Sequence, residues 1–283
     1  MVFYAASLSF NKPFQKSLQK KDFEGEPIIL AEKLLVEKAE YIKYKNKKML
    51  NMYVGNFLWD NEKLIAFRVG KEKKRKKNIY SESNMEFRRI DDEDYPNVII
   101  LWVREEQLIF IEKNTTVFQD SELVIRFLEN YLNQRLREYD LSIAIEFVSD
   151  ERIFWDYVSE YHGRIYALEF NLHMPNFFGD AHKPVKELLE SIKSSYNAEE
   201  LNSSIVNENG RLQISENDSR IKNFVSWVGA GGGTWDLTVD QEGKKTQKKS
   251  TDNAKSVSDG LENYTAEAIK KFVDIILHKL DLK

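Results

Sequence analysis

Basic side chains gather in two short stretches of a chain whose formal net charge is -4. In the first stretch, six of the seven residues at positions 71–77 are Lys or Arg, and the second stretch lies on and after a predicted hairpin near the C-terminal end. A DNA duplex carries one phosphate charge about every 1.7 Å along its axis, so exposed cations at this density would release counterions and bind it. We therefore predict DNA-backbone contacts from ten residues: Lys71, Lys73, Lys74, Arg75, Lys76, Lys77, Lys244, Lys245, Lys248 and Lys249.

The same lysines have a simpler interpretation as solvated loops. The net charge predicts no overall attraction to nucleic acid, and the acidic run DDED follows at 91–94. Within 71–77, however, only Glu72 interrupts the cations, so their field is expected to extend over a Debye length of about 8 Å at physiological salt. Few Arg, Asn or Gln side chains accompany them on a recognition helix, so base-specific reading is not predicted.

A nuclease is the main enzymatic alternative. Metal-dependent nucleases hold Mg²⁺ with carboxylates and stabilise developing charge with a lysine, and Asp236, Asp240, Glu242 and Lys244 can be aligned with that pattern. Glu242 and Lys244 fall on the predicted hairpin turn, however, and turns are rich in acids and lysines for other reasons. The nuclease stays open as an alternative.

Other catalytic motifs are weak or missing. The glycine-rich stretch at 229–234 follows a predicted helix and precedes a strand, whereas nucleotide-binding loops need the reverse order. His162, His173, His182 and His278 form no HExxH pair, and no G-x-S-x-G is present. The chain has no cysteine, which removes disulfides, thiolate ligands and a cysteine nucleophile. The leading interpretation is a protein without metal, cofactor or enzymatic activity, with the nuclease kept as the alternative.

The composition is that of a folded protein. Its 283 residues are 42% hydrophobic and 12% aromatic, enough for one large core or two smaller ones. No window approaches the roughly 20 consecutive apolar residues of a membrane-spanning helix, and the N-terminal sequence lacks the features of a signal peptide. We expect a cytoplasmic protein.

The first half of the chain is predicted to be rich in strands. Short β-branched and aromatic runs separated by polar turns predict strands at 2–10, 53–59, 64–69, 98–103, 108–112 and 143–147. The basic run at 71–77 is expected on an exposed hairpin or loop. Helical spacing predicts helices at 28–39 and at about 121–138, the second capped by Asp120 or Ser121.

The second half mixes helices and strands. Helices are predicted at 215–227 with Ser215 as cap and from Ala181 or Pro184 to 196, and a short helix or turn is predicted at 151–161. A strand is expected at 164–173, short strands at 203–206 and 211–214, and a hairpin formed by 235–239 and residues after Gly243. The polar stretch at 248–259 predicts a mobile linker or loop, and 264–282 a closing helix. The sequence thus predicts an α+β fold, with a sheet-rich domain at 1–162 and an α+β domain at 163–283 closed by the long terminal helix.

The order of several short motifs resembles the Rex-type phage-exclusion sensors of lambdoid prophages and, more loosely, other bacterial anti-phage families. The motifs are FYA at 3–5, YIKY at 41–44, LIAFRV before the lysine-rich stretch, a proline before the apolar strand at 96–103, GRIYALEF at 163–170 and TWDLTVDQEG at 234–243. The resemblance implies a DNA-binding, self-associating sensor without enzymatic activity that signals to a separate effector, often a membrane protein. The glycine-rich stretch and the polar stretch at 248–259 depart from it.

The leading hypothesis is therefore a largely sequence-independent DNA-binding sensor or regulatory subunit of an abortive-infection system. Its expected partners are DNA, a membrane or effector protein, and further copies of the chain. Two alternatives stay open: the metal-dependent nuclease, and a protein-binding subunit of a defence complex, which the aromatic content permits.

Overall fold

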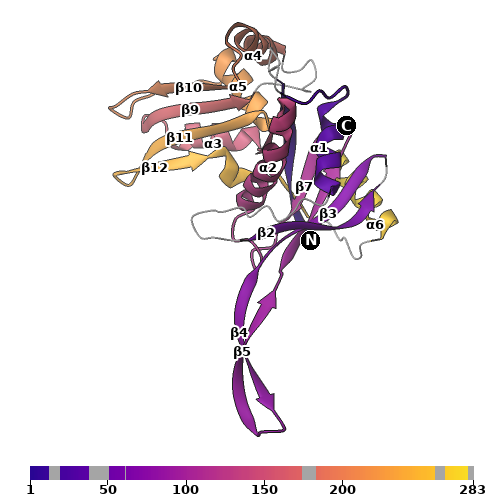
Figure 1. The fold of residues 1–283 in the computed structure, drawn as a ribbon. Helices are drawn as coiled ribbons and strands as arrows, with labels where there is room; N and C mark the ends of the chain where they lie inside the picture. The colour runs from indigo at the N-terminus through magenta and orange to yellow at the C-terminus, as the bar shows by residue number, and fades with distance from the viewer. Residues whose placement is uncertain (13–19, 38–50, 61, 174–182, 259–264, 280–283) are drawn as a thin grey trace.

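The computed structural model describes residues 1–12, 20–37, 51–60, 62–173, 183–258 and 265–279. It is an α+β protein, as predicted, with a seven-stranded sheet, a four-stranded sheet and a two-stranded ribbon (Figure 1). The motif at 41–44 and the residues Ala181 and His182 lie outside the described residues. Among the helices described, none combines the length and the apolar character needed to cross a bilayer.

The seven-stranded sheet has the order β13-β1-β7-β6-β3-β2, with β8 also paired to β1. All of its ladders are antiparallel. Its central strands are buried on both faces, which is why they are continuous apolar runs rather than alternating patterns. The strands are β1 (Val2–Asn11), β2 (Met52–Asp60), β3 (Leu64–Lys71), β6 (Asn97–Val103), β7 (Leu108–Glu112), β8 (Ser142–Phe147) and β13 (Ser256–Ser258).

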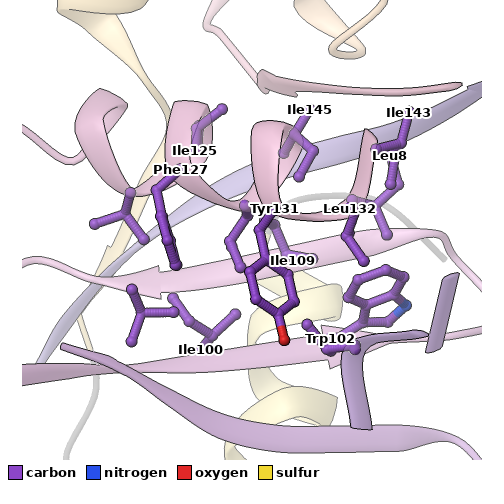
Figure 2. Packing of buried hydrophobic residues seen from close by; sticks show 14 of the residues in the cluster. Leu8, Ile100, Trp102, Ile109, Ile125, Phe127, Tyr131, Leu132, Ile143 and Ile145 are labelled. Carbon is purple, nitrogen blue, oxygen red and sulfur yellow. The ribbon is translucent and has the colours of Figure 1, made fainter. Parts of the chain in front are cut away.

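Helices cover both faces of this sheet. α1 (Pro27–Val36) and α2 (Glu122–Leu136) pack on one face, and α6 (Ala266–Lys279) packs on the other. Figure 2 shows the apolar side chains of α2 pointing into the first core, where they meet side chains from the strands. The labelled members of that core are Ile125, Phe127, Tyr131 and Leu132 from α2, and Leu8, Ile100, Trp102, Ile109, Ile143 and Ile145 from the strands.

The four-stranded sheet has the order β10-β9-β11-β12 and its own core. Alternate residues of β11, among them Trp235, Leu237 and Val239, are buried in this core, because successive side chains of a strand point to opposite faces. The sheet contains β9 (Ile165–His173), β10 (Glu200–Val206), β11 (Gly233–Gln241) and β12 (Lys244–Lys249), and its helices are α3 (Glu151–Glu160), α4 (Lys183–Tyr196) and α5 (Ser219–Gly229).

The two sheets are joined by polar contacts and by the path of the chain. The Ser7 hydroxyl donates to the Gly231 carbonyl at 2.5 Å, and His173 of β9 is hydrogen bonded to Glu146 of β8. After β12 the chain returns to the first sheet, where Phe272 of α6 packs on Phe3 of β1. The last described strand and helix therefore belong to the first sheet, whereas α3 packs with the second. The division at 162/163 stays a prediction.

Over its described residues, 248–258, the polar stretch is not the mobile linker or loop that the sequence predicts, which corrects the prediction. β12 continues to Lys249, residues Ser250–Asn253 form a 3₁₀ turn, and β13 pairs with β1. The hydroxyl of Ser250 is buried and accepts the backbone N–H of Trp235 at 3.1 Å. The order comes from long-range pairing, to which only Val257 contributes a buried apolar side chain, so no local periodicity announces it.

Two local predictions in the second half are also wrong. Helix α5 begins at Ser219 with Asp218 as its cap, because the Asp218 carboxylate accepts the N–H of Arg220 at 2.9 Å, while Ser215 forms the preceding turn. Residues 211–214 form no strand, since only Arg211 bridges to Ile165. The remaining predicted helices and strands are confirmed where they are described.

Candidate interaction arm

The basic run at 73–77 lies on a long β-ribbon that leaves the body of the protein (Figure 1). β4 (Lys73–Ser81) and β5 (Glu86–Asp94) pair with each other and with no other described strand. At about 3.4 Å per residue, nine residues in each strand give an arm about 30 Å long. The sequence analysis predicts an exposed hairpin or loop here. The structure adds the length of the hairpin, because residues 73–81 pair with residues 86–94.

Hydrogen bonds fix the root of the arm, where β3 passes into β4 and β5 into β6. The backbone N–H of Glu72 donates to the carbonyl of Asn51 at 2.9 Å, and the Asn51 amide donates to the Glu72 carboxylate at 2.5 Å. On the other strand, Tyr95 donates to Glu93 at 3.0 Å and its ring packs against Tyr53. The direction of the arm is thus set by specific contacts with β2 and its neighbours.

Carboxylates face the basic run along the inner part of the arm, residues 73–76 and 91–94, which we call the shaft. Residues directly opposite in an antiparallel pair have Cβ atoms about 4.5–5.5 Å apart, which is well within a Debye length. Ion pairs supplement this register, with Arg75 3.2 Å from Asp94 and Lys74 3.4 Å from Glu72. The opposed residues are Lys73 and Asp94, Lys74 and Glu93, Arg75 and Asp92, and Lys76 and Asp91.

This register changes the electrostatic argument made from the sequence. Between positions 73 and 94 the chain has seven basic and six acidic residues, so the arm as a whole is close to neutral. The positive field expected from 71–77 is therefore compensated by the second strand. The sequence contains a sign of this pairing, because the basic run and DDED lie at equal distances from the turn at 82–85. The two runs face each other only if the chain turns at those residues.

Apolar side chains occupy the end of the arm. Tyr80 and Phe87 lie opposite each other with ring centroids 5.1 Å apart, and they are 51% and 83% exposed. Met85, in the turn, is 80% exposed. Large apolar groups exposed together are uncommon on a monomer and mark interaction sites. We call Tyr80, Met85 and Phe87 the arm tip; the sequence analysis did not identify it, although the spacing of the aromatic residues about the turn was visible.

Cations also flank the arm tip. Lys77 lies opposite Ile90 and Arg89 lies opposite Asn78, and neither has an ion pair among the residues that the structure describes. Arg88 lies 3.4 Å from Glu86 on the same strand. The outer half of the arm therefore combines aromatic surface with three cations and two carboxylates, Glu82 and Glu86, whereas the inner half pairs its charges across the ribbon.

Lys71 does not belong to the arm. It ends β3, and its ammonium group lies 5.0 Å from the centre of the Phe118 ring. Burial, with the neighbouring charge of Lys73, lowers the pKa of Lys71 below its ordinary value. A half-buried lysine in this position packs on the body and is poorly placed to meet a phosphate.

The second basic group lies on edge strand β12, not on a second projecting tip. Lys245 sits 4.3 Å from the centre of the Tyr166 ring, Lys248 donates to Gln241 at 3.1 Å, and Lys249 lies 3.8 Å from Asp236. Alternation along the strand sends Lys245 and Lys249 to one face and Lys244 and Lys248 to the other. The two basic groups therefore lie on separate elements, one on the arm and the other on the edge of the four-stranded sheet.

The nuclease pattern is not assembled. Asp236 pairs across the sheet with Glu169 and Lys249, whereas Glu242 lies six residues further on, about 20 Å along the strand, in a turn of left-handed residues. Burial raises the pKa of Asp236, and the charge of Lys249 partly opposes that shift. Among the described residues no group of three or more His, Asp or Glu side chains is placed to hold a metal ion.

The glycine-rich loop is filled by protein atoms. Gly231 has φ +86°, and a Cβ there would overlap the Ser7 hydroxyl. The Gly232 carbonyl accepts the indole N–H of Trp227 at 2.7 Å, and a Cβ on Gly233 would overlap the Asn171 carbonyl. Gly231 thus allows close packing between the two sheets, and Gly232 and Gly233 allow it around the four-stranded sheet, which explains their presence without a bound phosphate.

The described histidines are not a metal site. His162 and His278 are exposed, and His173 is half-buried against Glu146.

Comparison of the chain with protein-family models, with curated proteins and with solved structures found no match. The proposals below are therefore argued from the geometry of the arm and of the sheet edges.

Proposed function

We propose that the protein is a non-enzymatic binding subunit that recognises a partner protein through the arm tip. The observation that carries this proposal is the exposed pair Tyr80 and Phe87 at the end of a nearly neutral ribbon. Aromatic residues and Met are enriched at protein interfaces, where they supply most of the binding free energy. A neutral shaft imposes no electrostatic penalty on a partner of either sign.

The geometry of the arm suits this role. The root contacts made by Glu72 and Tyr95 hold the direction of the ribbon, so a partner meets a pre-ordered surface and less conformational entropy is lost on binding. Because the arm tip lies at the outer end of the arm, away from the body, it can enter a groove of the partner without rearrangement of the body.

The test is co-purification with the product of a neighbouring gene, co-expressed with the tagged chain in nuclease-treated extract. The double variant Tyr80→Ser/Phe87→Ser is expected to retain less than a tenth of the partner and to keep its thermal stability. Ile29→Ser, which changes a 57% exposed apolar residue on α1, is the matched control and is expected to bind normally. Equal retention by the double variant would refute the role of the arm tip.

A second candidate is DNA binding, which the cations beside the arm tip favour. A two-stranded ribbon fits a DNA groove, and apolar side chains at its end can wedge between base pairs. The resemblance to Rex-type sensors provides a setting for this candidate: a cytoplasmic, self-associating sensor of an abortive-infection system that signals to an effector. The contacts would come from Lys77, Arg88 and Arg89, with the inner lysines masked by their carboxylates.

Fluorescence anisotropy with labelled duplex DNA over a range of salt separates the two candidates. DNA binding predicts that Lys77→Gln/Arg88→Gln/Arg89→Gln weakens affinity and flattens the salt dependence by about 0.9 per lost phosphate contact. The control Lys244→Gln/Lys245→Gln/Lys248→Gln removes the same charge from β12. Affinity that falls equally in both triple variants would point to non-specific charge and not to the arm.

A further inference from the structure

β10 is an edge strand whose outer side is unpaired in the described part of the chain. The backbone N–H of Asn207 donates to Tyr166 of β9 at 2.7 Å. Because successive residues of a strand direct their backbone groups to opposite sides, Leu201, Ser203 and Ile205 bond to β9, whereas Asn202 and Ser204 direct theirs outward. Asn202 and Ser204 are both exposed.

Three other sheet edges, those of β12, β2 and β13, carry protective features that β10 lacks. Natural proteins blunt edges with lysines, bulges or short strands, since an open edge pairs with other chains. β12 carries four lysines in six residues, β2 has a register shift between Gly55 and Trp59, and β13 has three residues. β10 has the sequence ELNSSIV, with no Lys and no Pro. The lysines of β12 thus have a structural explanation, because they protect an edge. β10 has no such protection.

An apolar groove of about 370 Å³ runs beside the open edge, between β10 and helices α4 and α5. Ile205 and Leu188 stand at this groove and are 40% and 41% exposed, and Val206 at the end of the strand is 60% exposed. The groove is lined mainly by Pro184, Val185, Leu188, Ile205, Ile221 and Phe224. Unsatisfied backbone groups and unburied apolar side chains therefore coincide at one edge.

We infer that β10 pairs with β10 of a second copy of this chain, in an antiparallel dimer with its two-fold axis at Ser203. This register joins outward-facing residues only to outward-facing residues, so Asn202 of one protomer meets Ser204 of its partner in a hydrogen-bonded pair. It also places Leu201 opposite Ile205 on the groove side, and Glu200 opposite Val206 on the other side. Leu201 and Ile205 are both apolar, and no like charges are opposed.

A second copy of the chain is the partner we infer for β10, because the strand is complementary to itself in this register. Pairing about Ser203 uses all seven residues of β10 and extends the four-stranded sheet to eight strands across the axis. Each copy's Leu201 lies opposite the Ile205 of the other, so the symmetric contact adds apolar cover at the edge of both grooves. A closed two-fold arrangement leaves no further edge of this kind open, so a dimer is expected rather than a filament. The pairing is independent of the arm tip and does not rest on the proposed function.

Because the chain has no native cysteine, single cysteines test the register directly. Opposed residues of a non-hydrogen-bonded pair have Cα atoms about 4.5 Å apart, which a disulfide can span. Ser203→Cys is expected to form a dimer under mild oxidation that dithiothreitol reverses. Ser204→Cys, the matched control, is displaced from the axis and is expected to cross-link at least ten-fold less. Equal cross-linking, or none at Ser203→Cys, overturns the register.

Mass measurement of the intact protein in solution completes the test. At about 50 μM the wild type is expected at twice its 33.3 kDa, and Ser204→Pro at 33.3 kDa, because proline removes an outward N–H that the monomer does not use. Ser204→Ala keeps that N–H and is expected to stay dimeric. A monomeric wild type, or a dimer unaffected in a folded Ser204→Pro variant, overturns the proposal. If Ser204→Pro fails to fold, the two cysteine variants decide it.

Discussion

His173 and Glu146 meet at the junction of the two sheets, with the histidine Nε2 atom 2.9 Å from a carboxylate oxygen of Glu146. Burial alone would lower the pKa of His173, but the hydrogen bond to Glu146 and its charge outweigh burial and raise the pKa above its ordinary value. Glu129 of α2 lies near this pair and accepts the N–H of Ile145 at 2.7 Å. The cluster therefore links α2, β8 and β9, which belong to different cores.

Glu129 makes the stability of the protein depend on pH. Burial raises the pKa of this carboxyl to about 7, so the folded protein holds a proton that the unfolded chain releases near pH 4.5. The resulting penalty begins near pH 4.5, grows as pH rises and is complete above about 7. We predict that Glu129→Gln, which keeps an acceptor for Ile145, has little effect at pH 4.5 and raises the free energy of unfolding by about 1 kcal/mol at pH 8. Urea denaturation at both pH values checks this, and a gain confined to pH 4.5 would contradict the assignment.

His173 is also predicted to make the protein less stable as pH rises, because its ion pair with Glu146 is lost when the histidine loses its proton. Its raised pKa means that the ion pair stabilises the fold fully below the ordinary value of 6.5, and that this contribution is lost as pH rises through the folded pKa. His173→Gln is therefore expected to cost about 1–2 kcal/mol at pH 5.5 and less at pH 8.5. The measurement is again urea denaturation, with exposed His162→Gln as the control. A cost that is larger at pH 8.5 would remove the ion pair from the explanation.

The sequence predicts most helices and strands because their signals are local. The stripe of Phe127, Tyr131 and Leu132 defines α2, and β-branched runs define the central strands of the first sheet. The return of β13 and α6 to that sheet was missed, because pairing between β1 and residues some 250 positions away leaves no trace in either segment. A local pattern predicts an element, whereas its neighbour in space depends on the whole fold.

The candidate site shows the same limit. The basic run at 73–77 and the acidic run at 91–94 were both visible, but only the register makes Lys73 face Asp94 and exposes Tyr80 and Phe87 together at the end of the ribbon. The wrong expectation of an uncompensated positive field came from counting charges along one strand. Pairing positions outward from the turn would have found both features.

Gly231 is predicted to be essential for the contact between the sheets. Its φ of +86° strains any residue with a side chain, and a Cβ would overlap the Ser7 hydroxyl. We predict that Gly231→Ala lowers the free energy of unfolding by more than about 2 kcal/mol. The control Gly163→Ala has φ +72° with no atom within 4 Å of the added Cβ, so it measures the backbone cost alone. Thermal or urea denaturation compares the two, and equal losses would show that overlap with Ser7 has no effect.

The last prediction concerns the charge balance of the arm. Asp92 and Asp94 lie opposite Arg75 and Lys73, so Asp92→Asn/Asp94→Asn leaves two cations of the shaft without their facing carboxylates. If those carboxylates mask the basic run, the double variant binds duplex DNA more tightly at low salt than the wild type does. The slope of log affinity against log salt is then steeper by up to about 2. Glu208→Gln/Glu216→Gln makes the same change in net charge at exposed sites on the body and controls for overall charge. Anisotropy titrations at several salt concentrations measure both slopes. Equal slopes for the two double variants would mean that DNA, where it binds, does not contact the shaft. The cations of β4 would then act only within the arm, where they pair with the carboxylates of β5.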